Sequence, residues 1–260
     1  MIYVTGDLHG PMGLDRLEAW EEGGPGDHLI VTGDFGHPWD YSADECAKIA
    51  WLESRPYTVL FVDGNHERYD HWSGRRVEPW CGGAIQRLSP HSPIRRLMRS
   101  EVHEIDGVRI FTLGGAASID RAFRIPFATW WPQEIPTERN FDEARANLSA
   151  RDWEVDYVVT RTCPRSILAS TLFPATPTPG LEDEALTAFL DELDRKLDFK
   201  RWCYGHFHRD RDVDARHTTL FERIVPLGAG IAGSVSTVPK KTETQKRWGP
   251  RARPSIVAAP

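Results

Sequence analysis

The stretch YTVLFVDGNHE, residues 57–67, is a run of β-branched and aromatic residues that ends in small polar ones. Such a run predicts a buried parallel strand that carries its last side chains to the carboxyl edge of a sheet, where open α/β sheets bind ligands. Asn65 brings an amide oxygen that can bind a hard cation, and His66 an imidazole that can ligate a metal or move a proton. Because Gly-Asn is also common in turns, the sequence DGNHE alone leaves a plain turn open.

The length and charge of the chain limit its class. With 260 residues it can bury one substantial core, so we expect one domain and a tail. Its 32 basic and 38 acidic residues give a net charge of -6, which provides no general attraction to nucleic acid or to an anionic membrane. Any affinity for phosphate must therefore come from a local site. The sequence does not predict an oligomeric state.

Cysteine usage and the first residues predict a cytoplasmic protein. The four cysteines are scattered and form no C-x-x-C pair, which favours reduced, structural thiols. The opening sequence MIYVTGD lacks the basic region and the long apolar run of a signal peptide, and no later stretch approaches about 18 apolar residues. We therefore expect a soluble protein with no membrane partner.

Two further strand–loop–helix units precede the strand that ends at Val62. Residues 2–5 and 27–32 are predicted strands, and residues 12–22 and 43–54 are predicted helices with apolar residues at helical spacing. Consecutive units of this kind imply parallel strands joined by right-handed crossovers. The loops that follow the three strands should therefore open on the same edge of one sheet.

The middle of the chain changes character, because short strand candidates follow one another with Gly and Pro between them and without helices. This pattern favours antiparallel pairing, with Asp106-Gly107 as a hairpin turn. Further on, two helices alternate with two strands before a final hairpin at about residues 213–227. The predicted ranges are 85–88, 95–98, 102–105 and 108–114 for the short strands, 138–151 and 182–197 for the helices, and 155–160 and 201–204 for the later strands.

Polar side chains end four of the predicted strands. Their carboxylate, imidazole and amide groups form a mixed oxygen and nitrogen set that suits Mn²⁺, Fe²⁺ or Zn²⁺ and is too rich in nitrogen for Ca²⁺. In D-x-H and H-x-H the two polar residues project to the same side of an extended backbone, so two ligands can reach one centre. A carboxylate such as Asp34 can bridge two ions about 4 Å apart, a separation that suits in-line displacement at phosphorus. We therefore predict a metal site formed by Asp7, His9, Asp34, Asn65, His206 and His208.

These residues resemble the signature of the calcineurin-like metallophosphoesterases, which runs D-x-H, G-D, G-N-H-[DE], a lone His and G-H-x-H. Three further stretches look like a small bacterial and phage-type branch of that family: GDFG followed by Trp39, GGA followed by Ser118-Ile119-Asp120, and WWPQE at 130–134. The resemblance covers residues 1–227 as one metallophosphoesterase domain. It leaves residues 228–260 as a C-terminal tail that we expect to be flexible.

The resemblance implies an α/β fold, a four-layer α/β/β/α sandwich of mixed sheets with a dinuclear metal site. His66 would be the general acid that protonates the leaving oxygen, and Asp34 the catalytic carboxylate shared by both metals. Of the divalent ions we favour manganese. The implied ligand sets are Asp7, His9, Asp34 and His208 for one metal, and Asp34, Asn65 and His206 with a fourth protein ligand for the other.

One position departs from the family pattern. The lone His is expected at the end of a strand, and in VVTRTCP, residues 158–164, Arg161 stands in its place. A guanidinium has no lone pair for a metal and does not deprotonate in proteins. If Arg161 pointed into the site, its charge about 4 Å from a divalent ion would cost roughly 8 kcal/mol at an effective dielectric constant of about 20.

Three outcomes are open for Arg161. It can swing outward and leave a weakly bound second metal. It can occupy the place of the second metal, giving a mononuclear site in which the guanidinium grips the phosphate. It can also cripple the site, either in nature or as an engineered change. In each case turnover should fall, because the bridging hydroxide loses a cation that depresses its pKa.

From these features we expect a metal-dependent phosphoesterase with one or two ions, impaired or mononuclear because of Arg161. Metal-bound hydroxide would attack phosphorus in line, and Asn65, Arg161 and Arg124 are the residues expected to bind substrate. The substrate is a phosphorylated molecule, and the sequence does not select among a phosphoprotein, a nucleotide and a nucleic-acid end. Two alternatives are a catalytically weak or inactive phosphate-binding regulatory protein that keeps the fold, and a nuclease that uses the basic tail.

Overall fold

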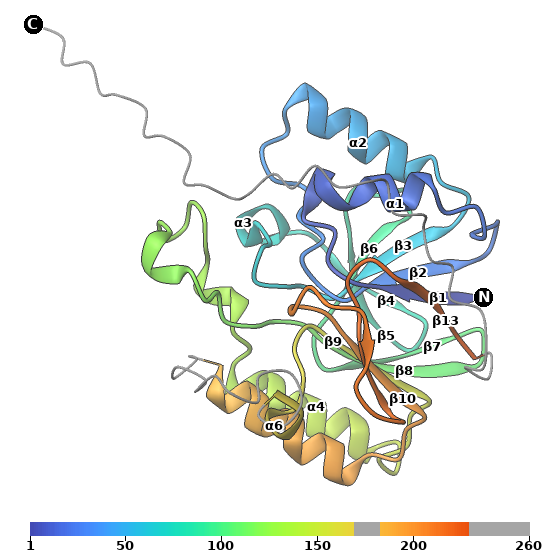
Figure 1. Cartoon of the computed structure of the whole chain (residues 1–260), viewed down its shortest axis with the longest axis vertical. Coiled ribbons are helices and arrows are strands. Elements are labelled where there is room, and N and C mark those ends of the chain that lie inside the picture. Colours follow the sequence, from blue (N-terminus) through green and yellow to red (C-terminus); the bar gives the residue numbers. More distant parts are fainter. Residues whose placement is uncertain (169–182, 229–260) are drawn as a thin grey trace, which may run out of the picture.

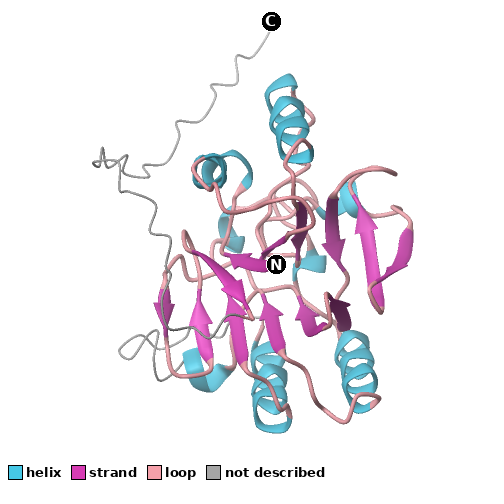
Figure 2. Cartoon of the chain, turned by 90° about the vertical axis from the view of Figure 1, so that its right-hand side faces the viewer, coloured by secondary structure: helices cyan, strands magenta, loops and turns pink. Residues whose placement is uncertain are grey.

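The computed structural model describes residues 1–168 and 183–228, so the predicted tail lies outside the described residues except for Gly228. The described residues form two mixed β-sheets that face each other, with helices on the two outer faces (Figure 1). Figure 2 shows the same arrangement edge-on, with helices at the top and bottom of the view and strands between them. The predicted four-layer α/β/β/α sandwich is therefore confirmed.

The first sheet has seven strands. Strands β1 to β3 are parallel, as the sequence predicts, and lie next to one another. Strand β6 continues the parallel run, whereas the strands at both edges are antiparallel. In spatial order the strands are β13 (Ile224–Leu227), β1 (Ile2–Thr5), β2 (His28–Val31), β3 (Thr58–Phe61), β6 (Ile94–Leu97), β5 (Gly83–Arg87) and β4 (Val77–Trp80).

The second sheet has six strands, of which the central four run parallel to one another. The two outer strands are antiparallel to their neighbours. In spatial order the strands are β11 (Arg211–Asp212), β12 (His217–Thr219), β10 (Arg201–Tyr204), β9 (Tyr157–Thr160), β8 (Val108–Leu113) and β7 (Glu101–Ile105).

The helices divide between the two sheets. Those from the first half of the chain cover the first sheet, and α4 and α6 cover the second (Figure 1). Short 3-10 helices lie at Gly10–Gly13, Arg121–Phe123 and Pro132–Glu134. No helix of the described residues is both long and apolar enough to cross a membrane. The helices are α1 (Leu14–Glu18), α2 (Ala43–Glu53), α3 (Tyr69–Trp72), α4 (Glu138–Ser149), α5 (Arg165–Ile167) and α6 (Glu184–Lys196).

Alternation along the strands explains the layers. In β3, Val59 and Phe61 join the cluster beneath the helices of the first sheet, whereas Leu60 joins the cluster between the sheets. In β9, Val158 packs toward the helices of the second sheet and Val159 toward the first sheet. Because successive side chains of a strand point to opposite faces, an uninterrupted apolar run buries both faces of its sheet.

The sequence misplaced several elements. The run of short strands is divided between the two sheets: β5 and β6 pair antiparallel in one, and β7 and β8 in the other. Strand β6 also pairs parallel with β3, and β4 was not predicted. The predicted final hairpin is wrong, because β12 pairs with β10 and β11 while β13 pairs with β1 of the other sheet. An apolar pattern indicates that a strand is buried, but it does not determine which strand pairs with it in a sheet.

Candidate metal centre

The candidate centre lies where strands of the two sheets end. Asp7 follows β1, Asp34 follows β2, and Asn65 follows β3, and these strands are adjacent and parallel. Arg161 follows β9 and His206 follows β10, which are adjacent and parallel in the second sheet. The sandwich therefore brings together residues such as Asp7 and His206, which are 199 positions apart in the chain.

Glycines allow these loops to approach closely. A Cβ atom on Gly64 would run into the backbone nitrogen and the carboxylate of Asp34. Gly33 has a φ of +101°, and a Cβ there would meet the Cδ atom of Arg161. Both positions therefore require glycine, since a side chain would displace a residue of the centre.

Four of the predicted ligands hold a left-handed backbone. The φ angles are 50° at His9, 49° at Asp34, 74° at His206 and 49° at His208. Non-glycine residues adopt this conformation at a cost of about 1 kcal/mol or more each, and such residues concentrate at functional sites. The strained backbone at these four residues sets the directions of their side chains, at a cost in conformational free energy.

Arg161 points into the centre and is 1% exposed. Its Nη1 atom lies 2.6 Å from Oδ1 of Asp7, and its Nη2 atom pairs with Oδ2 of Asp34. Its Nε and Nη2 atoms also donate to Oδ1 of Asn65, at 3.2 and 3.1 Å. The outward orientation that the sequence left open is therefore not the one in the structure.

The ion pairs set the charge states of these residues. Burial alone would raise the pKa of Asp7, but the charge of Arg161 and the nearby rings of His208 and His9 hold it well below its ordinary value. Burial also raises the pKa of Asp34, but the charge of Arg161 lowers it, and the net result is a lowered pKa. The pKa of Arg161 is raised, because Asp34 and Asp7 outweigh its burial. Two carboxylates and one guanidinium therefore leave the centre one negative charge in excess.

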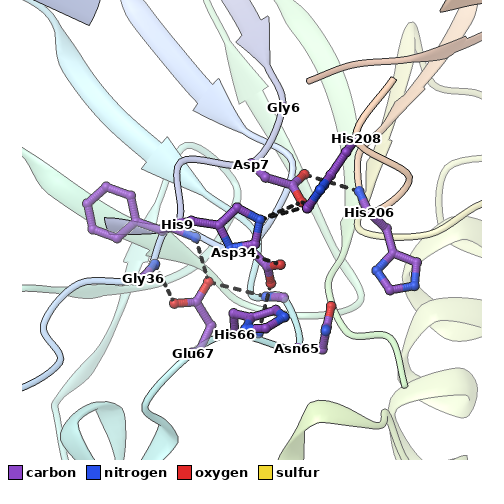
Figure 3. Close-up of polar contacts among 12 residues, drawn as sticks. Gly6, Asp7, His9, Asp34, Gly36, Asn65, His66, Glu67, His206 and His208 are labelled. Atoms are coloured by element: carbon purple, nitrogen blue, oxygen red, sulfur yellow. Dashed lines mark hydrogen bonds and ion pairs between the residues drawn. The ribbon is translucent and has the colours of Figure 1, made fainter. Parts of the chain in front are cut away.

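Asp7, His9 and His208 form a group that fits one metal ion (Figure 3). The Nε2 atoms of the two histidines face each other at 2.8 Å. Oδ2 of Asp7 lies 3.4 Å from His9 Nε2 and 3.1 Å from His208 Nε2, yet it is buried and has no hydrogen-bond partner in the described part of the chain. One carboxylate and two imidazoles that converge with an unpaired buried oxygen are a suitable ligand set for a divalent transition metal.

The second predicted ligand set does not fit an ion in this conformation. The guanidinium of Arg161 already contacts Asp34 and Asn65, two members of that set. The third, His206, donates its backbone N–H to Oδ1 of Asp7 at 3.1 Å, while Figure 3 shows its ring directed away from the His9–His208 pair. The described residues contain a second group of converging metal-binding atoms, from His9, Asp34 and His66. The ring of His206 belongs to neither this group nor the group of Asp7, His9 and His208.

His66 lies beside the first group and is covered by Arg124. Its backbone N–H donates to Oδ1 of Asp34 at 2.8 Å, and its ring centroid is 5.1 Å from that of His9. The Nη2 atom of Arg124 is 2.9 Å from both ring nitrogens of His66. Burial lowers the pKa of His66 to about 4, with Arg124 opposing the effect of Asp34. The imidazole is therefore neutral near pH 7 in the absence of a ligand.

Glu67 has a role that the sequence did not reveal. This buried carboxylate accepts hydrogen bonds from the backbone N–H groups of Phe35 at 2.8 Å, Gly36 at 3.1 Å and Gly64 at 3.3 Å, and so ties the loops after β2 and β3 together (Figure 3). Burial first and Asp34 second raise its pKa to about 8. Its position next to His66 in the motif was the one available signal.

Ser118 and Glu134 were also missed as parts of the centre. The side-chain amide of Asn65 donates to Oγ of Ser118 at 3.3 Å, and Ser118 donates in turn to Oε2 of Glu134 at 2.7 Å. The backbone N–H of Ser118 donates to Oε1 of the same carboxylate at 3.0 Å. Since Glu134 is fully buried, this series of hydrogen bonds fixes the amide of Asn65 with its oxygen toward Arg161.

Comparisons with known proteins identify the family. The family model for calcineurin-like phosphoesterases matches residues 1–210. A search of curated proteins finds no match to this chain. Among solved structures, the chain is similar to the crystal structure of a phosphopantetheinyl hydrolase from Mycobacterium tuberculosis, at 19% sequence identity and a TM-score of 0.44, over 85% of this chain and 89% of that one.

Proposed function

The chain belongs to the calcineurin-like phosphoesterase family and is a metal-dependent phosphoester hydrolase, and within that class we propose that it works with one metal ion and with Arg161 in the place of a second. The observation that carries this proposal is the buried contact of the guanidinium with Asp7, Asp34 and Asn65. Asp7, His9 and His208 would hold the ion. A divalent ion there supplies a Lewis acid and an activated water as nucleophile.

The charge of the centre supports one ion rather than two. Asp7 turns Oδ1 toward Arg161 and Oδ2 toward the two histidines, so its carboxylate separates the guanidinium from the proposed metal position. One divalent ion beside the single excess negative charge leaves the centre positive by one unit, which attracts a phosphate. A second ion about 4 Å from the guanidinium of Arg161 would be repelled by roughly 8 kcal/mol at an effective dielectric constant of about 20.

The surrounding residues have separate tasks in this proposal. Arg161 provides a fixed charge and holds Asp34 and Asn65 in place. Arg124, whose guanidinium lies over His66, binds a phosphate oxygen. A bound phosphate dianion offsets the charge of Arg124, which raises the pKa of His66 and lets its ring protonate the leaving oxygen.

The finer assignments extend this proposal. We propose manganese as the ion, because a site of one carboxylate and two imidazoles accepts it, and a phosphorylated molecule as the substrate. The cytoplasmic location stays a prediction from the sequence. Direct binding of the substrate by Arg161 also stays a prediction. In the structure its nitrogen atoms contact Asp7, Asp34 and Asn65, and its side chain is 1% exposed.

Metal titration by calorimetry, with hydrolysis of p-nitrophenyl phosphate recorded in parallel, tests the proposal. The parent chain should bind about one Mn²⁺ ion and hydrolyse the ester only when the ion is present. His9→Ala should lose both binding and hydrolysis, because it removes one of three ligands. His206→Ala is the matched control and should still bind about one ion, since its ring lies outside the proposed ligand group.

Two results would contradict the proposal. Binding of two ions by the parent chain, with loss of one in His206→Ala, would mean that Arg161 moves away and that the site is dinuclear. Binding of an ion without hydrolysis at any metal would instead favour the catalytically inactive phosphate-binding protein.

A further inference from the structure

A groove of about 660 Å³ leads away from the candidate metal centre. At one end it is lined by His9, His66 and His208, and at the other by residues of the loop before α2 and of α2 itself, including Trp39 and Lys48. The groove is much larger than a phosphate ion and has the size of an ordinary ligand pocket. It can therefore hold the part of a substrate that extends beyond the phosphate.

The walls of this groove are largely apolar. Met12 projects into solvent at 62% exposure, and Leu8 is fully buried beneath the groove. Phe221 stacks on the ring of His208, with 4.6 Å between centroids and 19° between planes, so the apolar wall begins directly at the metal end. Exposed Met and aromatic surface beside a polar centre is suited to binding an apolar group.

Trp39, which also lines the groove, is held in a fixed position. Its backbone N–H donates to Oε1 of Glu45 at 2.6 Å, and its carbonyl accepts from Nη1 of Arg68 at 2.6 Å. Its ring meets Trp131 edge-to-face, with 5.7 Å between centroids. The same Glu45 carboxylate also contacts Nδ1 of His37 at 2.8 Å. The wall is thus formed before any ligand binds, which reduces the entropy lost on binding.

The charges of the groove oppose an anionic extension. Among the described residues that line it, Lys48 is the only lysine or arginine, and it is paired with Asp44. Asp40, Asp44 and Glu45 give the same end of the groove an excess of negative charge. A second phosphate group placed there would be repelled.

We propose that this groove binds the organic group of the substrate, and that the substrate is a phosphate monoester of an apolar, uncharged alcohol rather than a nucleotide or a nucleic-acid end. The inference rests on the proposed function, because the phosphate must be bound at the metal end. Met12, Trp39 and Phe221 determine specificity by contacting the apolar group. Asp40 and Asp44 exclude polyanions.

Phosphonates, which cannot be hydrolysed, separate the two parts of the site. Calorimetry on the full chain with Mn²⁺ would compare methylphosphonate, hexylphosphonate and adenosine 5′-methylenediphosphonate. Hexylphosphonate should bind tighter than methylphosphonate by about tenfold or more, because its alkyl chain moves from water into the apolar groove. The nucleotide analogue should bind no tighter than methylphosphonate despite its larger size.

Substitutions in the groove test which residues produce the preference for hexylphosphonate. Met12→Ser and Trp39→Ala should each reduce the affinity ratio of hexylphosphonate to methylphosphonate several-fold. Val77→Ala removes apolar surface from a residue that is 52% exposed outside the groove, and should leave the ratio unchanged. Asp44→Lys should strengthen binding of the nucleotide analogue, whereas Asp142→Lys makes the same charge change at an exposed position of α4 and should not.

The outcomes distinguish this inference from the proposed function. If all three phosphonates bind with the same affinity, the groove does not select the organic group and the inference fails while phosphate binding stands. Tighter binding of the nucleotide analogue would overturn it in favour of a nucleotide. If no phosphonate binds, the proposed function and this inference fail together.

Discussion

Nη1 of Arg161 lies 2.6 Å from Oδ1 of Asp7, deep in the edge where the two sheets meet. The other oxygen of the same carboxylate faces His9 and His208. Asp7 thus pairs with a fixed organic cation on one side and with the proposed metal position on the other. In the proposed one-metal centre, the guanidinium of Arg161 stands where a dinuclear centre would hold its second ion.

Replacing Arg161 by His should convert the site to a dinuclear one. The change removes the guanidinium from Asp34 and Asn65 and supplies an imidazole in its place. We expect metal content to rise from about one to about two ions per chain, with a higher rate of p-nitrophenyl phosphate hydrolysis. Elemental analysis of the purified proteins measures the ions. Arg165→His, at a residue whose side chain is 55% exposed, is the control and should stay at about one.

An unchanged metal content in Arg161→His, with an unchanged rate, would contradict the account of the guanidinium as a substitute for an ion. A loss of folded protein would be detected by circular dichroism. Arg161→Met then serves as a second variant, since an apolar side chain of similar length should lower the repulsion toward metals without adding a ligand.

Gly64→Ala should disrupt the centre. The added methyl group would collide with the backbone nitrogen and the carboxylate of Asp34, and backbone atoms cannot move aside cheaply. We expect a loss of about 2 kcal/mol or more in the free energy of unfolding, together with weaker metal binding. Denaturant unfolding and metal titration measure the two effects. Gly24→Ala is the control, because its new Cβ would meet its nearest neighbour, Oδ2 of Asp27, at an ordinary 3.7 Å.

Ser118→Ala should loosen the amide of Asn65. The hydroxyl accepts from Asn65 at 3.3 Å and donates to the buried Glu134 at 2.7 Å, so both partners would lose a bond. Unsatisfied buried groups of this kind cost about 1–3 kcal/mol in the free energy of unfolding. The catalytic rate should also fall, because the amide oxygen of Asn65 is no longer held toward Arg161. In Ser149→Ala, at an exposed position of α4, both quantities should stay close to the parent values.

His217 should make stability depend on pH. Its Nε2 atom lies 3.2 Å from Oδ1 of Asp194, and its Nδ1 atom 2.9 Å from Oδ2 of Asp214. Burial alone would lower the pKa of His217, but the two carboxylates raise it above its ordinary value. The folded chain therefore binds the proton more tightly than the unfolded chain, so this stabilisation is complete below about pH 6.5 and is lost as pH rises through the raised pKa.

The stability difference between the parent and His217→Gln should accordingly be larger at about pH 6 than at about pH 9, by an amount on the order of 1 kcal/mol. Urea unfolding at several pH values measures it. His91→Gln, at an exposed position, should show no such dependence. A difference that grows with rising pH would mean that His217 is buried in its neutral form.

The sequence by itself determined much of the fold. The strands before Asp7, Asp34 and Asn65 were predicted to run parallel and to end at the same edge of one sheet, and the structure confirms this. These predictions succeeded because they depend on local properties: buried strands are continuous apolar runs, and they stop at small polar residues. The family resemblance carried by the same motifs is confirmed over residues 1–210, whereas the phage-type branch stays a prediction.

Only the tertiary structure decided how Arg161, Glu67 and Ser118 act, and which sheet receives β13. Arg161 is 127 positions from Asp34 in the chain, and its direction depends on carboxylates that only the packing of two sheets brings within reach. Glu67 is satisfied by backbone groups of a neighbouring loop, which leave no mark in the residue pattern. The reason is general: local sequence fixes backbone preference and burial, but electrostatic partners of a buried charge are fixed by long-range packing.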